Sequence, residues 1–445
     1  MPDIAALKER VCRAIDAHYD EILALGEDIR VHPELGFKEH RTAGLVAERF
    51  AALGMAPQTR LAVTGVKAVL RGRSPGPTVA YLGELDSVLV RDHPDADPET
   101  GAAHACGHNA QIATLVALAY GLVEAGALAD LDGAVALMAV PAEEYVEVEY
   151  RMGLREQGVI EFLGGKPELI RVGAFDDVQI TLSTHQTSED GPGRLGVSGA
   201  SNGCVVKRIR YLGTAAHAGA EPFKGVNALK AAMLGLQGID ANRETFKDED
   251  HIRVHPIITK GGALVNVIPD EVIMETYVRG ASVEAILDAQ AKVDRALQAG
   301  AMALGARVEI TTLPGYLPRI LHDDLTQAYR ENVVALVGEQ GWIEPRFGAG
   351  STDMGDVSQI MPAIEATANG AGGTGHGADY CIRDPEMAYI APAKTAAMTL
   401  IDLLSNGAAR ANAILARHKP AMTRDEYLAF LRRLARTSTW TPEPM

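Results

Sequence analysis

Four short apolar runs, each ending in polar or turn residues, constrain the fold of this chain most strongly. They are TVAYLGELD at 78–86, GAVALMAVPAEE at 133–144, VQITLSTH at 178–185 and AIEATANG at 363–370. Each run has the length and composition of a buried strand. Residues 108–125, between the first two runs, carry apolar side chains at spacings of three and four, which predicts a helix. A strand, a helix and a second strand form a parallel unit, so we expect an α/β domain with a mixed, largely parallel sheet.

The middle of the chain has a different pattern, which predicts a second domain. Antiparallel strands are expected at 204–213, 253–280 and 306–314, and amphipathic helices at 225–243 and 282–304. Two helices on an antiparallel sheet form an α+β arrangement. A chain of 445 residues also exceeds the ~250–300 at which single cores tend to divide. We therefore expect an α/β domain at 1–195 and 313–445, interrupted by an inserted α+β domain at 196–312.

Acidic and imidazole side chains follow all four predicted strands of the α/β domain. Ligands of parallel α/β sheets gather at the carboxyl ends of the strands, so these side chains should meet at one edge. A cysteine and a histidine join them at the start of the predicted helix, within HACGHNAQ at 104–111. The candidates in chain order are Glu84, Asp86, Cys106, His108, Glu143, Glu144, His185 and His376.

The chemistry of these side chains indicates a dinuclear metal site. Thiolate, imidazole and carboxylate together are ligands of zinc or another first-row metal. Two ions ~3.5–4 Å apart need several protein ligands, and five are available. These five are Cys106, His108, Glu144, His185 and His376. Glu143 could take a proton from water, and the helix N-terminus should lower the pKa of the Cys106 thiol.

Each candidate also has a purely structural interpretation. A single buried cysteine or histidine at a helix start is structural in most proteins. Glu143 and Glu144 could belong to a solvated face that continues with Glu147 and Glu149. A metal site is favoured because five ligand-type residues independently follow the same edge of one predicted sheet.

Six motifs in the same order resemble one known family. They are IRVHPELGFKEHRTA at 29–43, HACGHN at 104–109, PAEE at 141–144, GTAAHAGAEPFKGVNAL at 213–229, GGALVNVIPDEV at 261–272 and GTGHGADY at 373–380. The chain resembles the aminoacylase and carboxypeptidase family of metallopeptidases. It is most similar to the amidohydrolase branch, which includes auxin-conjugate hydrolases and aminobenzoyl-glutamate hydrolases. The similarity extends from about residue 4 to about residue 405.

This resemblance implies a catalytic α/β domain with a lid domain that also forms a homodimer. It implies two divalent ions per subunit, most often zinc or manganese, held by the five ligands named above. By the same resemblance, Glu143 is the general base and Asp86 orients a metal-binding imidazole. His217 corresponds to a lid histidine that reaches the partner subunit's site and stabilises the oxyanion.

Two segments bear on substrate preference. The branch typically has Asp-x-Asp after the first strand, whereas this chain has Glu84, and the loop that follows Asp86 is also unusual. We expect His93, in that loop, and Lys207 to be exposed. The lid residues that could bind a substrate carboxylate or carbonyl are Arg279, Asn227 and Asn266.

The predicted function is metal-dependent hydrolysis of a C–N bond by metal-activated water. The expected substrate is a small carboxylate-bearing N-acyl or N-aroyl amino acid. One alternative is hydrolytic deamination of an aromatic amino acid such as a substituted anthranilate, and another is a non-catalytic, metal-stabilised binding subunit. A net charge of −16 argues against nucleic acid or an anionic membrane as partner. Neither a signal-peptide pattern nor an apolar run of about 18 residues occurs, so we expect a cytoplasmic protein.

Overall fold

The computed structural model describes residues 3–189 and 191–442, which form two compact units. The first unit contains the chain up to Gly199 together with Ile320–Phe347 and Asp356–Thr423. The second contains Ala200–Arg319, Gly348–Gly355 and the chain from Arg424 onwards. The sequence-based division at 195 and 312 stays a prediction, and the units differ from it most clearly at the C-terminal end.

The first unit contains a mixed, largely parallel sheet of eight strands, which confirms the predicted fold class. Its order is β1 (Gln58–Leu61), β2 (Gly65–Arg71), β6 (Asp132–Val140), β3 (Ser74–Glu84), β7 (Ile180–Gln186), β15 (Ala363–Ala368), β8 (Leu195–Val197) and β14 (Trp342–Ile343). The four central strands β6, β3, β7 and β15 are mutually parallel. They are the four runs predicted from the sequence, and their carboxyl ends therefore lie at one edge of the sheet.

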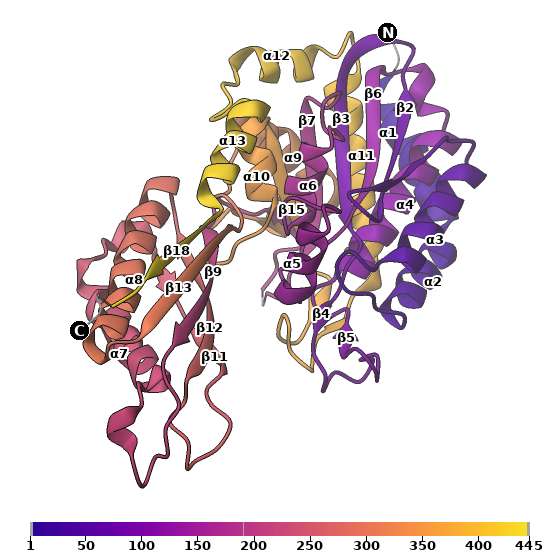
Figure 1. Ribbon diagram of the computed structural model, residues 1–445. Coiled ribbons are helices and arrows are strands. Elements are labelled where there is room, and N and C mark those ends of the chain that lie inside the picture. The colour runs from indigo at the N-terminus through magenta and orange to yellow at the C-terminus, as the bar shows by residue number, and fades with distance from the viewer. Residues whose placement is uncertain (1–2, 190, 443–445) are drawn as a thin grey trace. The chain divides into compact units, whose positions relative to one another are not determined.

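Helix α4 (His108–Glu124) lies at the centre of the first unit, and its residues from His108 to Leu122 are all buried. A helix that is apolar all round needs cover on every side. The sheet and other helices provide that cover, as Figure 1 shows. The other helices of this unit are α1 (Ile4–Ala17), α2 (Tyr19–Arg30), α3 (His40–Ala52), α5 (Val148–Glu156), α6 (Gly165–Arg171), α9 (Asp323–Val337), α11 (Ala391–Leu404) and α12 (Ala409–Arg417). A further helix, α10 (Met354–Ile360), begins in the second unit and continues in the first.

The second unit is an α+β arrangement with an antiparallel sheet. The order of its main strands is β10 (Arg253–Val254), β12 (Glu271–Gly280), β9 (Gly203–Leu212), β13 (Arg307–Pro314) and β18 (Arg436–Trp440), and β11 (Ile257–Lys260) also pairs with β12. Helices α7 (Ala228–Ala241) and α8 (Val283–Leu304) pack side by side against this sheet (Figure 1). Buried residues alternate with less buried ones along β12, because only one face of the sheet meets the helices.

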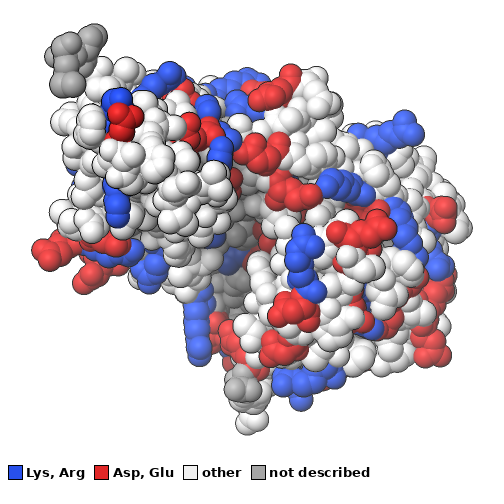
Figure 2. Space-filling view, turned by 60° about the horizontal axis from the view of Figure 1, so that its bottom comes forward, with Lys and Arg blue, Asp and Glu red and all other residues white. Residues whose placement is uncertain are grey.

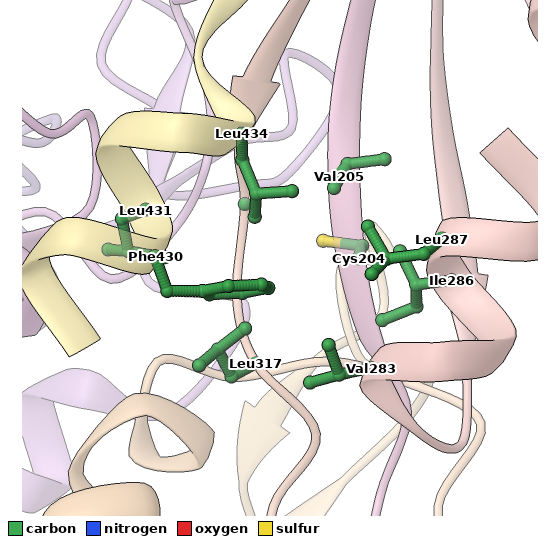
Figure 3. A pocket seen from close by; sticks show the side chains of 10 residues that line it. Cys204, Val205, Val283, Ile286, Leu287, Leu317, Phe430, Leu431 and Leu434 are labelled. Carbon is green, nitrogen blue, oxygen red and sulfur yellow. The ribbon is translucent and has the colours of Figure 1, made fainter. Parts of the chain in front are cut away.

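The C-terminal segment completes the second unit, whereas the sequence analysis assigned it to the α/β domain. Helix α13 (Arg424–Leu434) buries an apolar stripe that includes Tyr427 and Leu431, and β18 pairs with β13. Figure 3 shows Phe430 and Leu434 of α13 facing Cys204 across a small apolar hollow. Four arginines in the segment 424–436 gave it a charged appearance and obscured the helical spacing of the apolar residues.

Lys207 is fully buried, so the prediction of an exposed side chain was wrong. Its Nζ lies 2.7 Å from Asp294 Oδ1 and donates a hydrogen bond of 2.9 Å to Thr312 Oγ1. Lys207 is on the helix-covered face of β9, where a buried cation requires such partners. Arg210, three residues later, has its guanidinium partly exposed and pairs with Glu271 at 2.7 Å.

Figure 2 shows acidic and basic side chains interspersed on the face in view. Within the described residues, none of the helices combines the length and apolar character needed to cross a membrane.

Candidate metal centre

Seven residues predicted for the site lie together at the carboxyl edge of the first unit's sheet. They are Asp86, Cys106, His108, Glu143, Glu144, His185 and His376. Cys106 Sγ is 3.3 Å from His185 Nε2 and 3.3 Å from His376 Nε2. His376 Nε2 is also 3.2 Å from Glu144 Oε1. Side chains that are 270 positions apart in the sequence therefore face one another.

Two local backbone features bring the thiol and the imidazoles into place. Gly107, between Cys106 and His108, has φ of 86°, and a Cβ there would lie 2.5 Å from Tyr380 Oη. Only glycine satisfies both constraints, so helix α4 can start immediately after Cys106. His376 has φ of 60° and donates its backbone N–H to Ala105 O at 2.8 Å, which ties the glycine-rich loop to the cysteine segment.

Asp86 links His108 to the loop that carries the two glutamates. His108 is fully buried, and its Nδ1 lies 2.9 Å from the backbone oxygen of Asp86 and 3.3 Å from Asp86 Oδ1. Because a carbonyl oxygen only accepts, Nδ1 carries the proton and Nε2 points toward the other candidate ligands. Asp86 Oδ2 accepts the backbone N–H of Glu144 at 2.9 Å.

The two adjacent glutamates are largely buried, so their interpretation as a solvated face was wrong. Glu143 is 8% exposed, and its Oε2 lies 3.9 Å from His108 Nε2. The Glu144 side chain is 11% exposed and faces His376. Glu147, later in the same acidic run, instead pairs with Lys38 at 2.8 Å.

Arg151, which the sequence analysis did not single out, supports the glutamate loop. It lies on α5, is fully buried, and donates to Leu163 O at 2.7 Å and to the backbone oxygen of Glu144. Its guanidinium also lies 5.3 Å from the centre of the Phe37 ring. In the sequence, Arg151 follows a charged run, and no pattern in a single chain distinguishes it from a surface arginine.

Glu84, Lys166 and Gln111 form a buried polar cluster beside His108. Lys166 Nζ is 2.5 Å from Glu84 Oε1, and Gln111 Nε2 donates to Glu84 Oε2 at 2.6 Å. Glu84 Oε2 lies 3.1 Å from His108 Nε2. Burial by itself would raise the pKa of Glu84. The combined effect of Lys166, His108 and His185 is larger and lowers this pKa from its ordinary value to about 2. Sequence reasoning left the role of Glu84 open and missed Lys166, which lies on the short helix α6.

The donor atoms fit a pair of metal ions. Cys106 belongs to two groups of donors, one with His108 and His185 and the other with Glu144 and His376. Two atoms bound to one ion at about 2.0–2.3 Å and a tetrahedral angle lie about 3.3–3.6 Å apart. The separations of 3.2–3.3 Å within these groups are close to this range. Nε2 of His108 is buried and, among the described residues, has no hydrogen-bond partner, as expected for a metal-binding nitrogen.

The Cys106 thiol differs from expectation in its acidity. Burial and the neighbouring Glu144 raise its pKa well above the ordinary value, whereas the sequence analysis expected the helix N-terminus to lower it. Desolvation and a negative neighbour outweigh the helix dipole, whose effect is modest. A thiolate at this position therefore depends on cations close by, as metal ligation would provide.

His217 and Asn266 lie on adjoining loops of the second unit. The backbone N–H of Ala218 donates to Asn266 O at 2.9 Å. His217 is exposed, and its Nδ1 accepts the backbone N–H groups of Gly219 at 3.2 Å and Ala220 at 3.0 Å. Its proton is therefore on Nε2, which can donate a hydrogen bond.

The other two candidates of the second unit have structural contacts. Asn227 caps helix α7, with its Oδ1 accepting the backbone N–H of Lys230 at 3.0 Å. Arg279 donates to Ser351 Oγ at 2.7 Å and lies over the Tyr277 ring. It is near the end of β12, and the eight residue steps from Glu271 to Arg279 span about 26 Å. Arg279 and Asn266 therefore lie at opposite ends of the second unit's sheet.

His93 is only 7% exposed, so the prediction that it is exposed was wrong. Its Nε2 donates to Tyr380 O at 2.9 Å, and its Nδ1 accepts the backbone N–H of Asp95 at 3.1 Å. These bonds tie the unusual loop after Asp86 to the segment that follows His376. His93 therefore stabilises the conformation of this loop, because both of its ring nitrogens form hydrogen bonds.

Comparison with known proteins identifies the family. The description Peptidase family M20/M25/M40 matches residues 81–399. An Xaa-Arg dipeptidase of Mus musculus is 31% identical over 373 residues, covering 81% of this chain and 79% of the relative. An N-acyl-L-amino acid amidohydrolase of Geobacillus stearothermophilus is 25% identical over 344 residues, covering 75% and 87%.

A solved structure shares the fold. It is a dinuclear metal-binding peptidase of the M20 family from Bacillus subtilis, with a TM-score of 0.66 and 22% identity, and the match covers 87% of this chain and 99% of that chain. The match to the family description spans more than half of the chain and includes every residue of the candidate metal centre. The predicted resemblance is thus confirmed, and the chain belongs to Peptidase family M20/M25/M40 as a metal-dependent hydrolase of C–N bonds.

Proposed function

We propose that this enzyme hydrolyses the amide bond of small N-acyl or N-aroyl amino acids at two divalent ions. The ions would be held by Cys106, His108, Glu144, His185 and His376. The observation that carries this proposal is the convergence of two donor groups on the Cys106 thiol, with Glu143 beside them. The name of the Geobacillus relative supports the substrate class, and that of the mouse relative adds dipeptides that end in arginine.

The residues around the centre supply the proton transfers and the geometry. When bound, the two ions would polarise the substrate carbonyl and lower the pKa of a water molecule. Glu143 accepts a proton as that water adds to the carbonyl carbon, and it returns the proton to the leaving amine as the C–N bond breaks. Asp86 keeps His108 in one orientation through its contacts to Nδ1.

The finer parts of the proposal concern the metal, the substrate and the compartment. Zinc suits a set of one thiolate, three imidazoles and one carboxylate, and manganese is the other metal that the family resemblance implies. Arg279 can hold a substrate carboxylate with two parallel hydrogen bonds. Asn227 and Asn266 can bind the carbonyl or carboxylate; because Asn266 adjoins the His217 loop, far from Arg279, it would do so together with His217 in the partner's site. We place the enzyme in the cytoplasm because its four cysteines are free thiols, which suits a reducing compartment.

Metal removal and reloading test the proposed reaction. A chelator should reduce turnover of N-acyl and N-aroyl amino acids and of Xaa-Arg dipeptides to background, and two equivalents of zinc or manganese should restore it. Release of a free amino acid, measured by chromatography, supports amide hydrolysis. Ammonia release from a substituted anthranilate would instead support the deaminase alternative. A protein that binds two ions but turns over no substrate of the panel would support a binding subunit.

The proposal includes a homodimer in which His217 of one subunit serves the site of its partner. Exposed apolar side chains on the second unit support an interface there: Phe223, Ile257, Leu264 and Val265. Strand β11 is exposed along its whole length and could pair with another strand. The Nε2–H of His217 suits an oxyanion, which accepts hydrogen bonds.

Mixing two inactive variants tests this arrangement. His217→Ala should lower kcat by about 10²–10³-fold with little loss of metal, because one oxyanion donor is lost. Glu143→Gln should also be nearly inactive. If His217 acts on the partner's site, random exchange of the two variants restores about a quarter of the wild-type sites, since each hybrid dimer has one complete site. Activity that stays at the level of the separate variants after exchange would contradict the proposal.

A further inference from the structure

Glu84 is a buried carboxylate beside the candidate metal ligand His108, and the proposed function gives it no role. It is 2% exposed and ends β3, and its Oε2 lies 3.1 Å from His108 Nε2. His108 Nδ1 donates to a backbone carbonyl, so Nε2 is the ring nitrogen that faces Glu84. A buried carboxylate oxygen and an imidazole nitrogen at this separation attract a cation between them, either a proton or a metal ion. The same separation is close to that of two ligands of one ion.

The surroundings of Glu84 hold it in this orientation. Gln111 Nε2 donates to Oε2 at 2.6 Å, and Lys166 Nζ is 2.5 Å from Oε1. Lys166 and Gln111 are themselves buried. The carboxylate therefore cannot turn away from His108 without breaking two buried polar contacts, one of them an ion pair.

Lys166 also sets the charge of the cluster. Glu84 and Lys166 together are neutral, so this carboxylate can offer an oxygen to a metal ion without adding net negative charge. A buried ammonium so close to two divalent ions is unfavourable by itself, and Glu84 compensates it. Lys166 should therefore weaken the bond between Glu84 and a metal ion, and its removal should strengthen that bond.

We propose that Glu84 is an additional protein ligand of the ion held by His108, and that Lys166 moderates its strength. This inference rests on the proposed two-metal function and assigns a role to the glutamate that replaces the usual aspartate. His108, Glu84 and Glu143 also form a group whose donor atoms lie within 4.8 Å of one another. Glu143 remains the proposed base, because its Oε2 lies 3.9 Å from His108 Nε2, farther than Glu84 Oε2 at 3.1 Å.

Isothermal titration of the metal-free protein with zinc gives the decisive measurement. Glu84→Gln should weaken one of the two binding steps by about 10–100-fold and leave the other near its wild-type affinity. Lys166→Met should tighten the same step. Glu84→Asp, which keeps the charge on a shorter side chain, should lie between the wild type and Glu84→Gln. Cobalt(II) absorption of the loaded proteins should change for Glu84→Gln, because loss of a ligand alters the coordination geometry.

Matched controls and a double variant separate ligation from a structural role. Glu156→Gln and Lys230→Met make the same chemical changes at exposed positions and should bind both ions like the wild type. If Glu84→Gln misfolds because Lys166 is left unpaired, the double variant Glu84→Gln/Lys166→Met removes both charges. The double variant should bind one of the two zinc ions more weakly than Lys166→Met does. This loss of affinity should match the loss between the wild type and Glu84→Gln.

The outcomes distinguish this inference from the proposed function. A wild type that binds two zinc ions and hydrolyses acyl-amino acids, with Glu84→Gln binding both ions equally well, would overturn the role of Glu84 alone. Weaker binding by Lys166→Met would overturn the moderating role of Lys166. A wild type that does not bind two ions would overturn both the proposed function and this inference.

Discussion

Replacing Glu143 by glutamine should lower kcat by about 10²–10⁴-fold, the usual contribution of a general base and acid. Glutamine has nearly the same shape but cannot accept the proton of water or return it to the amine. Because Glu143 is not among the five proposed ligands, the variant should still bind two ions and unfold at nearly the wild-type temperature. Steady-state kinetics on the best acyl-amino acid, together with zinc titration, check these three expectations.

Glu156→Gln is the matched control for this variant. Glu156 is exposed at the end of α5, so the same loss of charge should leave kcat and KM unchanged. A Glu143→Gln variant that keeps more than about a tenth of wild-type kcat would remove Glu143 from the role of base. If it also lost one ion, Glu143 would instead be acting as a ligand.

Cys106→Ser should have the second large effect, because both donor groups share this one thiol. A serine hydroxyl is a poor metal ligand, so both ions should bind more weakly rather than one. We expect kcat/KM to fall by about 10³-fold or more, since the ions contribute several kcal/mol of transition-state stabilisation. Zinc titration and elemental analysis of the purified variant measure the loss of metal directly.

Thermal unfolding gives an independent measurement of the same variant. Ions that bind only the native state raise Tm, so zinc should stabilise the wild type and have a much smaller effect on Cys106→Ser. Cys12→Ser, on helix α1, makes the same change away from the centre and should respond to zinc like the wild type. Wild-type affinity for both ions in Cys106→Ser would contradict the shared-thiol arrangement.

Much of the architecture could be predicted because the relevant signals are local. Strands β3, β6, β7 and β15 and helix α4 follow from apolar runs and periodicity within single segments. The topology of parallel strands then brings their carboxyl ends to one edge, so the convergence of Cys106, His185 and His376 also followed. The family motifs added the roles of Glu143 and His217, which remain predictions for these residues.

The parts that were missed depend on contacts between distant segments. Lys166 is an ordinary lysine in the sequence, and only its position 2.5 Å from Glu84 gives it a role at the metal centre. Arg151 likewise looks like the end of a charged surface run. The acidity of Cys106 was predicted wrongly because burial, which the sequence does not reveal, outweighs the helix dipole.

The sequence by itself determined the family, the two kinds of sheet and the side chains that can bind metal, because these depend on residue type, order and periodicity. Only the tertiary structure decided which charges are buried and paired. It brought Lys166 to Glu84, turned Lys207 inward to Asp294, and added the C-terminal helix and strand to the second unit. Burial and pairing arise from packing between segments far apart in the chain, and the free energy of a charge depends on that environment rather than on its neighbours in sequence.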